Sequence, residues 1–193
     1  MTDEVRSAQN PPDAQDPDLA RDVAARLRDI PDFPEPGVLF KDFTPLLLDV
    51  PLRDRVVRDV VGRHDGAVDA VLGIEARGFI LGAVIAQELE VGFIPVRKQG
   101  KLPAATHAVS YALEYGTATV EIHTDAVQAG QRVLVVDDVL ATGGTAEAAV
   151  QLIRRAGGTV TGLAVLLELG FLAGQARVEQ VLGGAPLEAL VTV

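Results

Sequence analysis

From residue 70 to residue 167, short apolar runs alternate with longer stretches of helical periodicity, and this alternation restricts the fold more than any other feature. The apolar runs cover 70–74, 91–96, 133–136 and 160–167, and the helical stretches cover 79–89 and 146–156. Strands that read as continuous apolar runs are buried on both faces, which is typical of parallel sheets covered by helices. We therefore predict an α/β fold with a central, mainly parallel sheet flanked by helices.

The length of 193 residues suits one well-buried domain and is short for two. Residues 1–15 are polar and contain adjacent prolines, which predicts a flexible tail ahead of a single domain at 16–193. A first helix is expected from Asp16, the N-cap, and Pro17, because apolar residues recur at helical spacing from Leu19 to Ile30. The three prolines in 31–36 exclude helix there and predict a loop, and Pro51 opens a second helix.

Charge and composition exclude several classes of protein. A net charge of −10 argues against a surface for the nucleic-acid backbone, so no nucleic-acid partner is expected. The absence of cysteine removes disulfides, thiolate nucleophiles and cysteine metal sites. No apolar run reaches the roughly 18–20 residues of a membrane span, and the N-terminus lacks a signal-like segment. We expect a cytoplasmic protein with no membrane partner.

The segment at 133–145, VLVVDDVLATGGT, carries the clearest chemistry. An apolar strand is followed by two adjacent carboxylates, Asp137 and Asp138, and then by a glycine-rich turn that leads into a helix near residue 146. In an open parallel sheet, ligands bind beyond the carboxyl ends of the strands. Backbone N–H groups of such a turn and the helix N-terminus can hold a phosphate. The expected phosphate-binding residues are Ala141, Thr142, Gly143, Gly144 and Thr145.

Carboxylates repel phosphate, so the acid pair needs another partner. Each acid can accept a hydrogen bond from one of two vicinal ribose hydroxyls, or the pair can join a Mg²⁺ shell. A phosphate pocket beside diol acceptors predicts a ribose 5-phosphate site. The alternative is a solvated acidic turn before an ordinary glycine-rich helix start. Neither a P-loop motif nor a dinucleotide-binding G-x-G-x-x-G motif is present.

Two further segments carry positive charge beside glycine. In 73–79, Arg77 can face a pyrophosphate and Gly78 permits close backbone approach, although a surface ion pair and a plain helix start explain them equally simply. In 97–103, three cations stand against the acidic trend of the chain, which indicates an anion partner or else a solvated loop. The segment 117–123 alternates polar and apolar residues and predicts a hairpin turning near 114–116.

These segments together resemble the adenine branch of the type I phosphoribosyltransferase family. The matching stretches are VLVVDDVLATGGT at 133–145, FPEPGVLFKD at 33–42, GIEARGF at 73–79, RKQGKLP at 97–103 and LEYG at 113–116. They occur in the family's order, and the similarity runs from about residue 17 to 172. The resemblance implies that family's fold, with a small N-terminal hood at about 30–45 and a flexible lid hairpin at about 97–116.

The resemblance also implies an activity: adenine and 5-phosphoribosyl 1-pyrophosphate (PRPP) become AMP and pyrophosphate in purine salvage. Glu114 would be the catalytic acid/base and Arg77 would stabilise the leaving group. Mg²⁺ would be held mainly through the substrate, and a homodimer is expected. The implied pyrophosphate and lid residues are Glu75, Ala76, Arg77, Arg97, Lys98 and Lys101. The implied adenine-binding residues are Val38, Leu39, Phe40, Lys41 and Leu169.

The chain departs from the family at Gln175, where members commonly carry arginine after a Leu-x-Gly sequence, and this puts the contact between hood and core in doubt. His64, His107 and His123 lack ligand spacing and are expected to be non-catalytic. Two rival functions remain open at this point. One is a phosphoribosyltransferase for another base, and the other is a regulator that senses PRPP and binds nucleic acid without catalysis.

Overall fold

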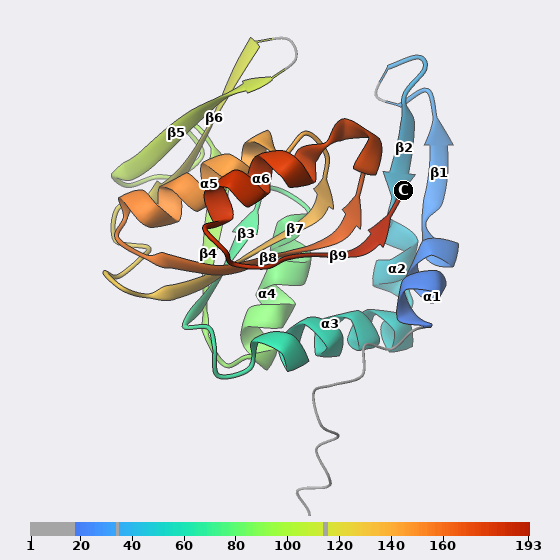
Figure 1. Ribbon diagram of the computed structural model, residues 1–193, viewed down its shortest axis with the longest axis horizontal. Coiled ribbons are helices and arrows are strands. Elements are labelled where there is room, and N and C mark those ends of the chain that lie inside the picture. Colours follow the sequence, from blue (N-terminus) through green and yellow to red (C-terminus); the bar gives the residue numbers. More distant parts are fainter. Residues whose placement is uncertain (1–17, 34, 114–115) are drawn as a thin grey trace, which may run out of the picture.

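The computed structural model describes residues 18–33, 35–113 and 116–193, so the predicted tail at 1–15, the expected N-cap Asp16 and the expected acid Glu114 lie outside the described residues. Figure 1 shows the arrangement of the elements. In chain order they are α1 (Leu19–Arg26), β1 (Arg28–Pro31), β2 (Leu39–Asp42), α2 (Thr44–Leu48), α3 (Val50–His64), β3 (Ala70–Ile74), α4 (Gly78–Glu88), β4 (Gly92–Lys98), β5 (Thr106–Leu113), β6 (Gly116–His123), β7 (Arg132–Leu140), α5 (Gly144–Arg155), β8 (Thr159–Glu168), the 3₁₀ turn η1 (Gly170–Leu172), α6 (Gly174–Leu182) and β9 (Leu187–Thr192).

The central sheet confirms the predicted fold class. Over the described ranges it has seven strands in the order β5-β6-β4-β3-β7-β8-β9. The pairs β3–β4, β3–β7, β7–β8 and β8–β9 are parallel. The hairpin β5–β6 is antiparallel, as expected from the alternating segment, and it joins the sheet where Arg97 and Lys98 of β4 lie opposite Glu121 and Val120 of β6.

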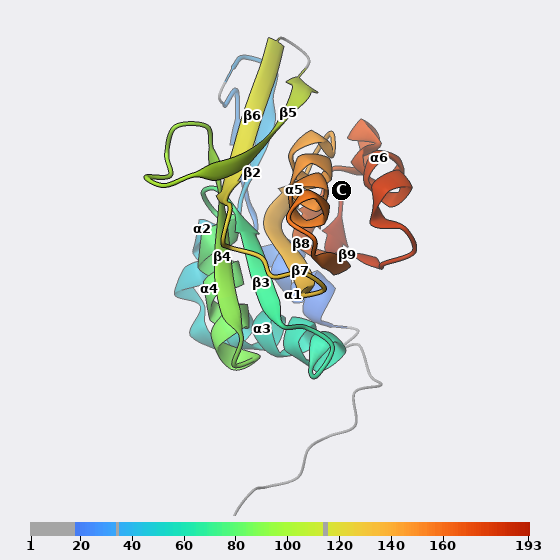
Figure 2. The same ribbon diagram turned by 90° about the vertical axis from the view of Figure 1, so that its left-hand side faces the viewer.

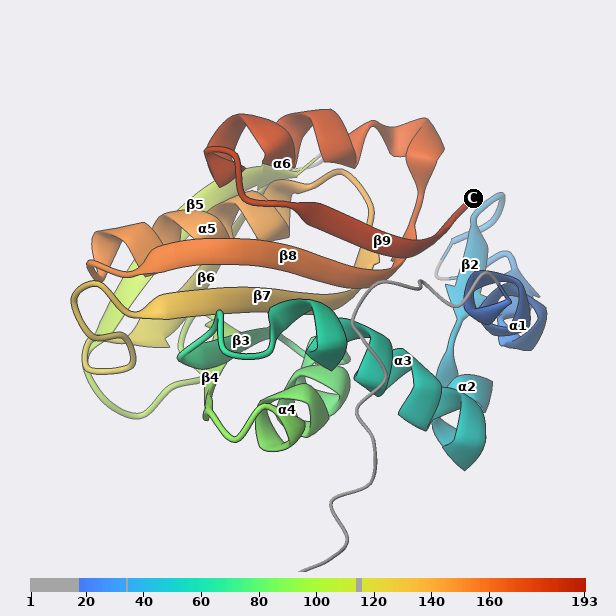
Figure 3. The same ribbon diagram turned by 60° about the horizontal axis from the view of Figure 1, so that its bottom comes forward.

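Helices cover both faces of the sheet, which explains why its inner strands are apolar throughout. Figure 3 shows α5 and α6 on one face and α3 and α4 on the other. All five residues of β3 are buried, as are Val133–Val136 of β7, so these strands contribute to the apolar core on each face. Helix α3 begins as predicted, with Pro51 in its first turn and the Asp49 carboxylate accepting a hydrogen bond from the Leu52 N–H at 3.2 Å.

The N-terminal segment differs from the prediction. The expected first helix ends at Arg26, and Ile30, which was assigned to it by spacing, lies in β1. Leu27 leaves the helix with extended dihedral angles (φ −66°, ψ 139°), and Arg28–Pro31 then pairs antiparallel with Leu39–Asp42. The prolines excluded helix as predicted, but Pro31 ends an edge strand, where its missing N–H is tolerated. The hood at about 30–45 therefore includes a two-stranded hairpin.

Strand β7 is longer than predicted. It continues from Arg132 to Leu140, so Asp137 and Asp138 lie within the strand and not beyond its end. Its partner β8 extends beside it, and pairing continues through Asp137 opposite Val165 and Val139 opposite Leu167. No prediction was made for the last two elements. Strand β9 forms one edge of the sheet, and helix α6 covers one of its faces (Figure 3).

The two hairpins, β1–β2 and β5–β6, rise on the same side of the molecule (Figures 1 and 2). Because parallel strands end at one edge of a sheet, the residues that follow β3 and the last residues of β7 and β8 lie between these hairpins. No helix among the described residues is long and apolar enough to cross a membrane.

Candidate active site

The turn after β3 and the end of β7 form the floor of the site. β3 and β7 are parallel neighbours, so the Glu75-Ala76-Arg77 turn lies beside Asp137. The peptide bond between Glu75 and Ala76 is cis. A Cβ atom on Gly78 would lie 2.9 Å from Asp137 Oδ1 and from the Val136 carbonyl oxygen. Only glycine therefore lets helix α4 begin this close to β7.

The two adjacent carboxylates have different surroundings. Asp138 is buried, and its Oδ2 lies 2.8 Å from Arg77 Nε in an ion pair that lacks hydrogen-bond geometry. Asp137 Oδ1 accepts a hydrogen bond from the Asp138 N–H at 2.9 Å. Although Asp137 partly faces the cavity, desolvation by the surrounding protein raises its pKa well above 3.8. The Asp138 carboxylate adds to this rise and Arg77 partly offsets it.

The glycine-rich loop after β7 lines a small hollow of ≈ 80 Å³ at the start of α5. Gly143 has φ +78°, in the left-handed region that glycine adopts without strain. A Cβ on Gly143 would lie 2.7 Å from the Gly174 carbonyl oxygen, and one on Gly174 would overlap the Ala141 carbonyl oxygen. Helix α6 therefore packs against the loop from behind, and the N-terminus of α5 faces the hollow as an anion site requires.

A larger cavity of ≈ 360 Å³ joins this loop to the N-terminal hood. It shares Asp137, Val139, Ala141 and Thr145 with the small hollow, so the two adjoin each other. It gathers every expected adenine-binding residue together with the turn after β3 and both acids. The full lining is Val38, Leu39, Phe40, Lys41, Ile74, Glu75, Ala76, Arg77, Asp137, Asp138, Val139, Ala141, Thr145, Leu167 and Leu169.

The hood contributes an aromatic and apolar wall. Arg77 places its guanidinium carbon 4.9 Å from the ring centroid of Phe40 and 5.7 Å from that of Phe43. Phe33 meets Phe40 edge-on with ring centroids 5.1 Å apart, although Phe33 itself is 51% exposed. The Lys41 ammonium pairs with Asp29 at 2.7 Å, so this cation is already engaged at the cavity wall.

The basic segment lies next to the cavity and does not line it. Arg97 Nη2 is 3.1 Å from Glu75 Oε1, and the Lys98 N–H donates to Glu75 Oε2 at 2.9 Å. The hydrogen bond from Arg97 is the largest cause of the lowered pKa of Glu75, which burial opposes. Arg97 also donates to the Lys101 carbonyl oxygen at 3.1 Å. The structure thus connects Arg97 and Lys98 to the turn through Glu75, while the Lys101 side chain is exposed.

Three polar residues near the site were not singled out from the sequence. Tyr111 on β5 accepts a hydrogen bond from the Thr145 hydroxyl at 2.8 Å. Glu121 on β6 is buried and accepts hydrogen bonds from the loop after β4. Arg177 on α6 is 2.6 Å from Glu147 in the first turn of α5. Glu121 belongs to the segment whose alternation predicted the hairpin. Tyr111 and Arg177 reach the glycine-rich loop only through the fold.

Several sequence expectations concern residues away from the cavity. Gln175 donates to Glu179 at 2.7 Å on the exposed face of α6. His64 is buried and lies 2.9 Å from Glu188 Oε2, and within the described chain none of the three histidines lines the cavity. Glu114 lies outside the described residues, so its acid/base role stays a prediction.

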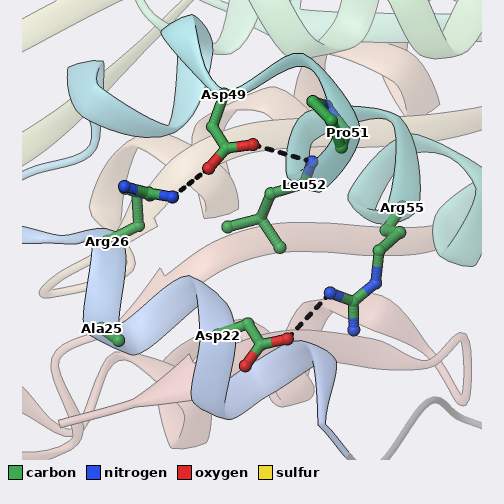
Figure 4. A pocket seen from close by; sticks show the side chains of 7 residues that line it. All are labelled: Asp22, Ala25, Arg26, Asp49, Pro51, Leu52 and Arg55. Carbon is green, nitrogen blue, oxygen red and sulfur yellow. Dashed lines mark hydrogen bonds and ion pairs between the residues drawn. The ribbon is translucent and has the colours of Figure 1, made fainter.

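A second hollow, of ≈ 440 Å³, lies between α1 and the start of α3 (Figure 4). Its four charged side chains form two ion pairs, Arg26 with Asp49 and Arg55 with Asp22. Because each charge faces a partner of opposite sign, this hollow offers no net field for an ionic ligand, in contrast to the glycine-rich loop.

Comparison with known proteins gives a consistent result. The family model described as "Phosphoribosyl transferase domain" matches residues 48–180. A Streptomyces galbus protein named adenine phosphoribosyltransferase is 61% identical over 173 residues, which cover 89% of this chain and 94% of that protein. An adenine phosphoribosyltransferase structure from Rhodothermus marinus has a TM-score of 0.85 and 46% identity, covering 91% of this chain and 98% of that one. The Saccharomyces cerevisiae enzyme, crystallised with adenine and an imino-altritol bisphosphate, has a TM-score of 0.82 and 35% identity, covering 89% and 98%.

Proposed function

This chain belongs to the phosphoribosyl transferase family, and from that membership we propose that its cavity converts adenine and PRPP to AMP and pyrophosphate. The observation that carries the proposal is that two adjoining hollows bring together a glycine-rich loop, two carboxylates, an arginine and an apolar hood. The chain is an enzyme of the pentosyl-transfer class with the type I phosphoribosyltransferase fold, as its relatives are. Its reaction serves purine salvage.

We assign the donor to the loop side of the cavity. The 5'-phosphate would sit at the N-terminus of α5 against residues 141–145, where backbone N–H groups and the Thr142 and Thr145 hydroxyls can donate to it. Asp137 and Asp138 would accept from the ribose hydroxyls. Arg77 would hold the leaving pyrophosphate, with Glu75 and Ala76 shaping the turn. Lys98, Lys101 and Arg97 would complete the pyrophosphate side, and the lid role of residues about 97–116 stays a prediction.

We assign adenine to the hood side. Phe40 and Leu169 line the cavity and would lie on the two faces of the purine ring, where stacking and apolar contact favour a flat base. Backbone groups of Val38 and Leu39 would read the edge of the ring, with Lys41 at the rim. Adenine N9 must lose its proton as it bonds to the ribose and pyrophosphate leaves; Glu114 would lend a proton to the purine N7 during this step and take it back once the N9–ribose bond has formed. Catalysis would come mainly from positioning and electrostatics, with inversion at the anomeric carbon.

Mg²⁺ fits this site as an ion that enters with the donor. No group of three or more His, Asp or Glu side chains is placed to hold a metal within residues 18–33, 35–113 and 116–193. Mg²⁺ commonly keeps several waters and binds substrate phosphates, so the ion would be held mainly through the donor, and no side chain is assigned to it as a direct ligand. When bound, the ion would offset the negative charge that develops on the pyrophosphate.

A cytoplasmic homodimer is the assembly we propose. A hollow at the junction of α2 and α3 is lined by the ion pair of Arg26 with Asp49 and by four apolar residues, Pro45, Leu48, Val50 and Pro51. Leu48 is 86% exposed there, and a large exposed apolar side chain in such a group marks an interaction surface. The cytoplasmic location still depends on the composition alone.

The proposed reaction is tested by pyrophosphate release with PRPP, Mg²⁺ and one base at a time. We expect turnover with adenine and little with guanine, xanthine or pyrimidines. Turnover with another base but not with adenine would reassign the specificity. Binding of PRPP without turnover would instead support the regulator.

Two variants test the assigned roles. Glu114→Gln should lower kcat by about 100-fold or more, the scale of general acid–base catalysis, and spare PRPP affinity. Full activity in this variant would remove Glu114 from the chemistry.

Asp138→Asn should weaken PRPP binding about tenfold, because a charged hydrogen-bond acceptor for ribose is lost and Arg77 loses its ion-pair partner. Unchanged PRPP affinity would exclude Asp138 from the ribose site.

A further inference from the structure

Strand β5 lies across the start of helix α5, so a side chain from the hairpin reaches the phosphate loop. The Thr145 hydroxyl donates a hydrogen bond to Tyr111 Oη at 2.8 Å. The Tyr111 ring occupies the space beside Gly144, where a Cβ atom would lie 2.8 Å from Tyr111 Cδ2. Further along the same helix, Arg155 Nη1 donates to the Ala108 carbonyl oxygen at 2.8 Å. These contacts hold β5 and α5 together at two points.

The direction of the Tyr111–Thr145 contact matters because a hydroxyl has one proton and two lone pairs. Thr145 lines both the small hollow and the larger cavity. While Thr145 donates to Tyr111, it presents only lone pairs to that space. A phosphate oxygen is an acceptor, so it requires the Thr145 proton. Once Thr145 donates its proton to a phosphate oxygen, the Thr145 oxygen can accept a hydrogen bond in turn. The Tyr111 hydroxyl, 2.8 Å away, can then donate its proton to Thr145.

We propose that Tyr111 is a positioning residue for the 5'-phosphate of the donor, acting through Thr145. In the liganded enzyme the Tyr111 hydroxyl donates to Thr145, and Thr145 donates to a phosphate oxygen. Hydrogen bonds in such a chain polarise one another, so the Tyr111 proton strengthens the bond from Thr145 to phosphate. This inference rests on the proposed function, because it needs a 5'-phosphate in the hollow.

The competing explanation is packing: the Tyr111 ring could simply fill the space beside Gly144. The two explanations predict different consequences of losing one oxygen atom. Tyr111→Phe keeps the ring against Gly144 and removes the hydroxyl. Thr145→Val keeps the branched shape of Thr145 and removes the group through which Tyr111 would act.

The test measures dissociation constants of PRPP, ribose 5-phosphate and adenine for wild type, Tyr111→Phe, Thr145→Val and the double variant. We expect Tyr111→Phe to weaken PRPP and ribose 5-phosphate about fivefold, the scale of one neutral hydrogen bond, and to leave adenine unchanged. In the Thr145→Val background, adding Tyr111→Phe should cause no further loss, because the relay is already broken. If Tyr111 acted only by packing, Tyr111→Phe would change the affinities by the same factor in the wild-type and Thr145→Val backgrounds.

Ser110→Ala is the matched control. Ser110 is the neighbour of Tyr111 on β5, and its hydroxyl makes a similar 2.8 Å contact with the Thr119 hydroxyl on the exposed side of the hairpin. This variant should leave the affinity for all three ligands unchanged. Wild-type affinity for ribose 5-phosphate in Tyr111→Phe, or an equal loss in both Thr145 backgrounds, overturns the inference. Failure of the wild-type enzyme to bind PRPP or ribose 5-phosphate would instead overturn the proposed function.

Discussion

Arg177 places a positive charge beside the glycine-rich loop. The family's arginine is replaced by Gln175, which pairs with Glu179 on the surface of α6. Two residues later, Arg177 Nε lies 2.6 Å from Glu147, and Arg177 Nη1 would be 3.3 Å from a Cβ on Gly144. Glu147 in the first turn of α5 would repel a phosphate at that helix end, and the guanidinium of Arg177 offsets its charge.

We predict that Arg177→Gln weakens PRPP binding about threefold to tenfold at low ionic strength. The reason is that Glu147 then faces the phosphate without its partner. Arg177 is partly exposed, so salt screens the effect, and the difference from wild type should shrink in 0.5 M salt. Titration of PRPP at two salt concentrations measures this, with Gln175→Ala as the control that stays at wild-type affinity. A loss of PRPP affinity that is the same at both salt concentrations would contradict the electrostatic explanation.

At the scale of single residues, the sequence identified site candidates that are close together in the chain better than contacts between distant residues. Asp137, Asp138 and Thr145 could be identified because strand, acids and glycine loop are contiguous in the chain. Tyr111 is 34 positions from Thr145 and Arg177 is 30 positions from Glu147, so only the packing of β5 and α6 against α5 brings them together. Local spacing holds no information about such partners.

At the scale of elements, the hood hairpin is fastened to the core by Asp42, the last residue of β2. Its carboxylate accepts from the Thr44 N–H at 2.9 Å and from the Thr44 hydroxyl at 2.8 Å, and it pairs with Arg28 on β1. The Thr44 N–H is the largest cause that lowers the pKa of Asp42 to about 2, and Arg28 adds to it against the effect of burial. One side chain therefore links β1, β2 and the start of α2.

This carboxylate makes a pH-dependent contribution to stability. Its folded-state pKa of about 2 lies below the ordinary 3.8, so the stabilisation is present above about pH 4 and is lost as the pH falls towards 2. We predict that Asp42→Asn lowers the free energy of unfolding at pH 7 and that the difference from wild type narrows at pH 3. Urea unfolding at the two pH values measures it. Exposed Asp125→Asn is the control, and a difference that is equal at both pH values would disagree with the assignment.

The loop after β4 is organised by another buried acid, Glu121 on β6. Its Oε1 accepts from the N–H groups of Gly100, Lys101 and Leu102 at 2.9, 3.2 and 3.3 Å, and its Oε2 accepts from the Thr106 hydroxyl at 3.2 Å. A carboxylate accepts from all four donors with a negative charge. An amide would keep only a neutral oxygen for the three N–H groups and would donate its own N–H to the Thr106 hydroxyl. Glu121 therefore fixes the backbone that carries the basic residues.

We predict that Glu121→Gln lowers the free energy of unfolding by about 1–3 kcal/mol, because three charge-assisted hydrogen bonds from backbone N–H groups become weaker neutral ones. Tryptic cleavage at Lys101 should become faster, and the KM for pyrophosphate in the reverse reaction should rise severalfold. Glu88→Gln makes the same chemical change at an exposed position and should match wild type in all three measurements. Unchanged cleavage in Glu121→Gln would mean that the loop holds its shape without this acid.

The sequence predicted the elements of the sheet better than those of the hood. Strand β3 covers the same residues as the apolar run that predicted it, because all five residues are buried and none needs to be polar for an exposed face. The hood strands escaped notice because four residues on an exposed edge have no apolar pattern: Arg28, Asp29 and Pro31 of β1 are all exposed. Their pairing comes from the chain reversing between Pro31 and Leu39, which a local pattern does not encode.

At the scale of the whole molecule, the apolar surface at the α2–α3 junction bears on assembly. We predict that the wild-type protein is a dimer and that Leu48→Glu raises its dimer dissociation constant at least tenfold, since a charge would be buried in an apolar contact. Sedimentation equilibrium over a range of concentrations measures this. Phe171→Glu, at a side chain that is 76% exposed elsewhere, is the control expected to stay dimeric. A Leu48→Glu protein as dimeric as wild type would place the interface on another face.

Arg77 touches both halves of the cavity, since it pairs with Asp138 on β7 and lies over Phe40 of the hood. Ligands on either side of such a shared side chain form a closed thermodynamic cycle. If bound adenine changes the affinity for pyrophosphate by some factor, bound pyrophosphate must change the affinity for adenine by that same factor. The affinity for each ligand can be titrated with and without the other ligand at saturation, and the two titrations must give the same factor. Arg77 is the contact through which the two ligands would influence each other.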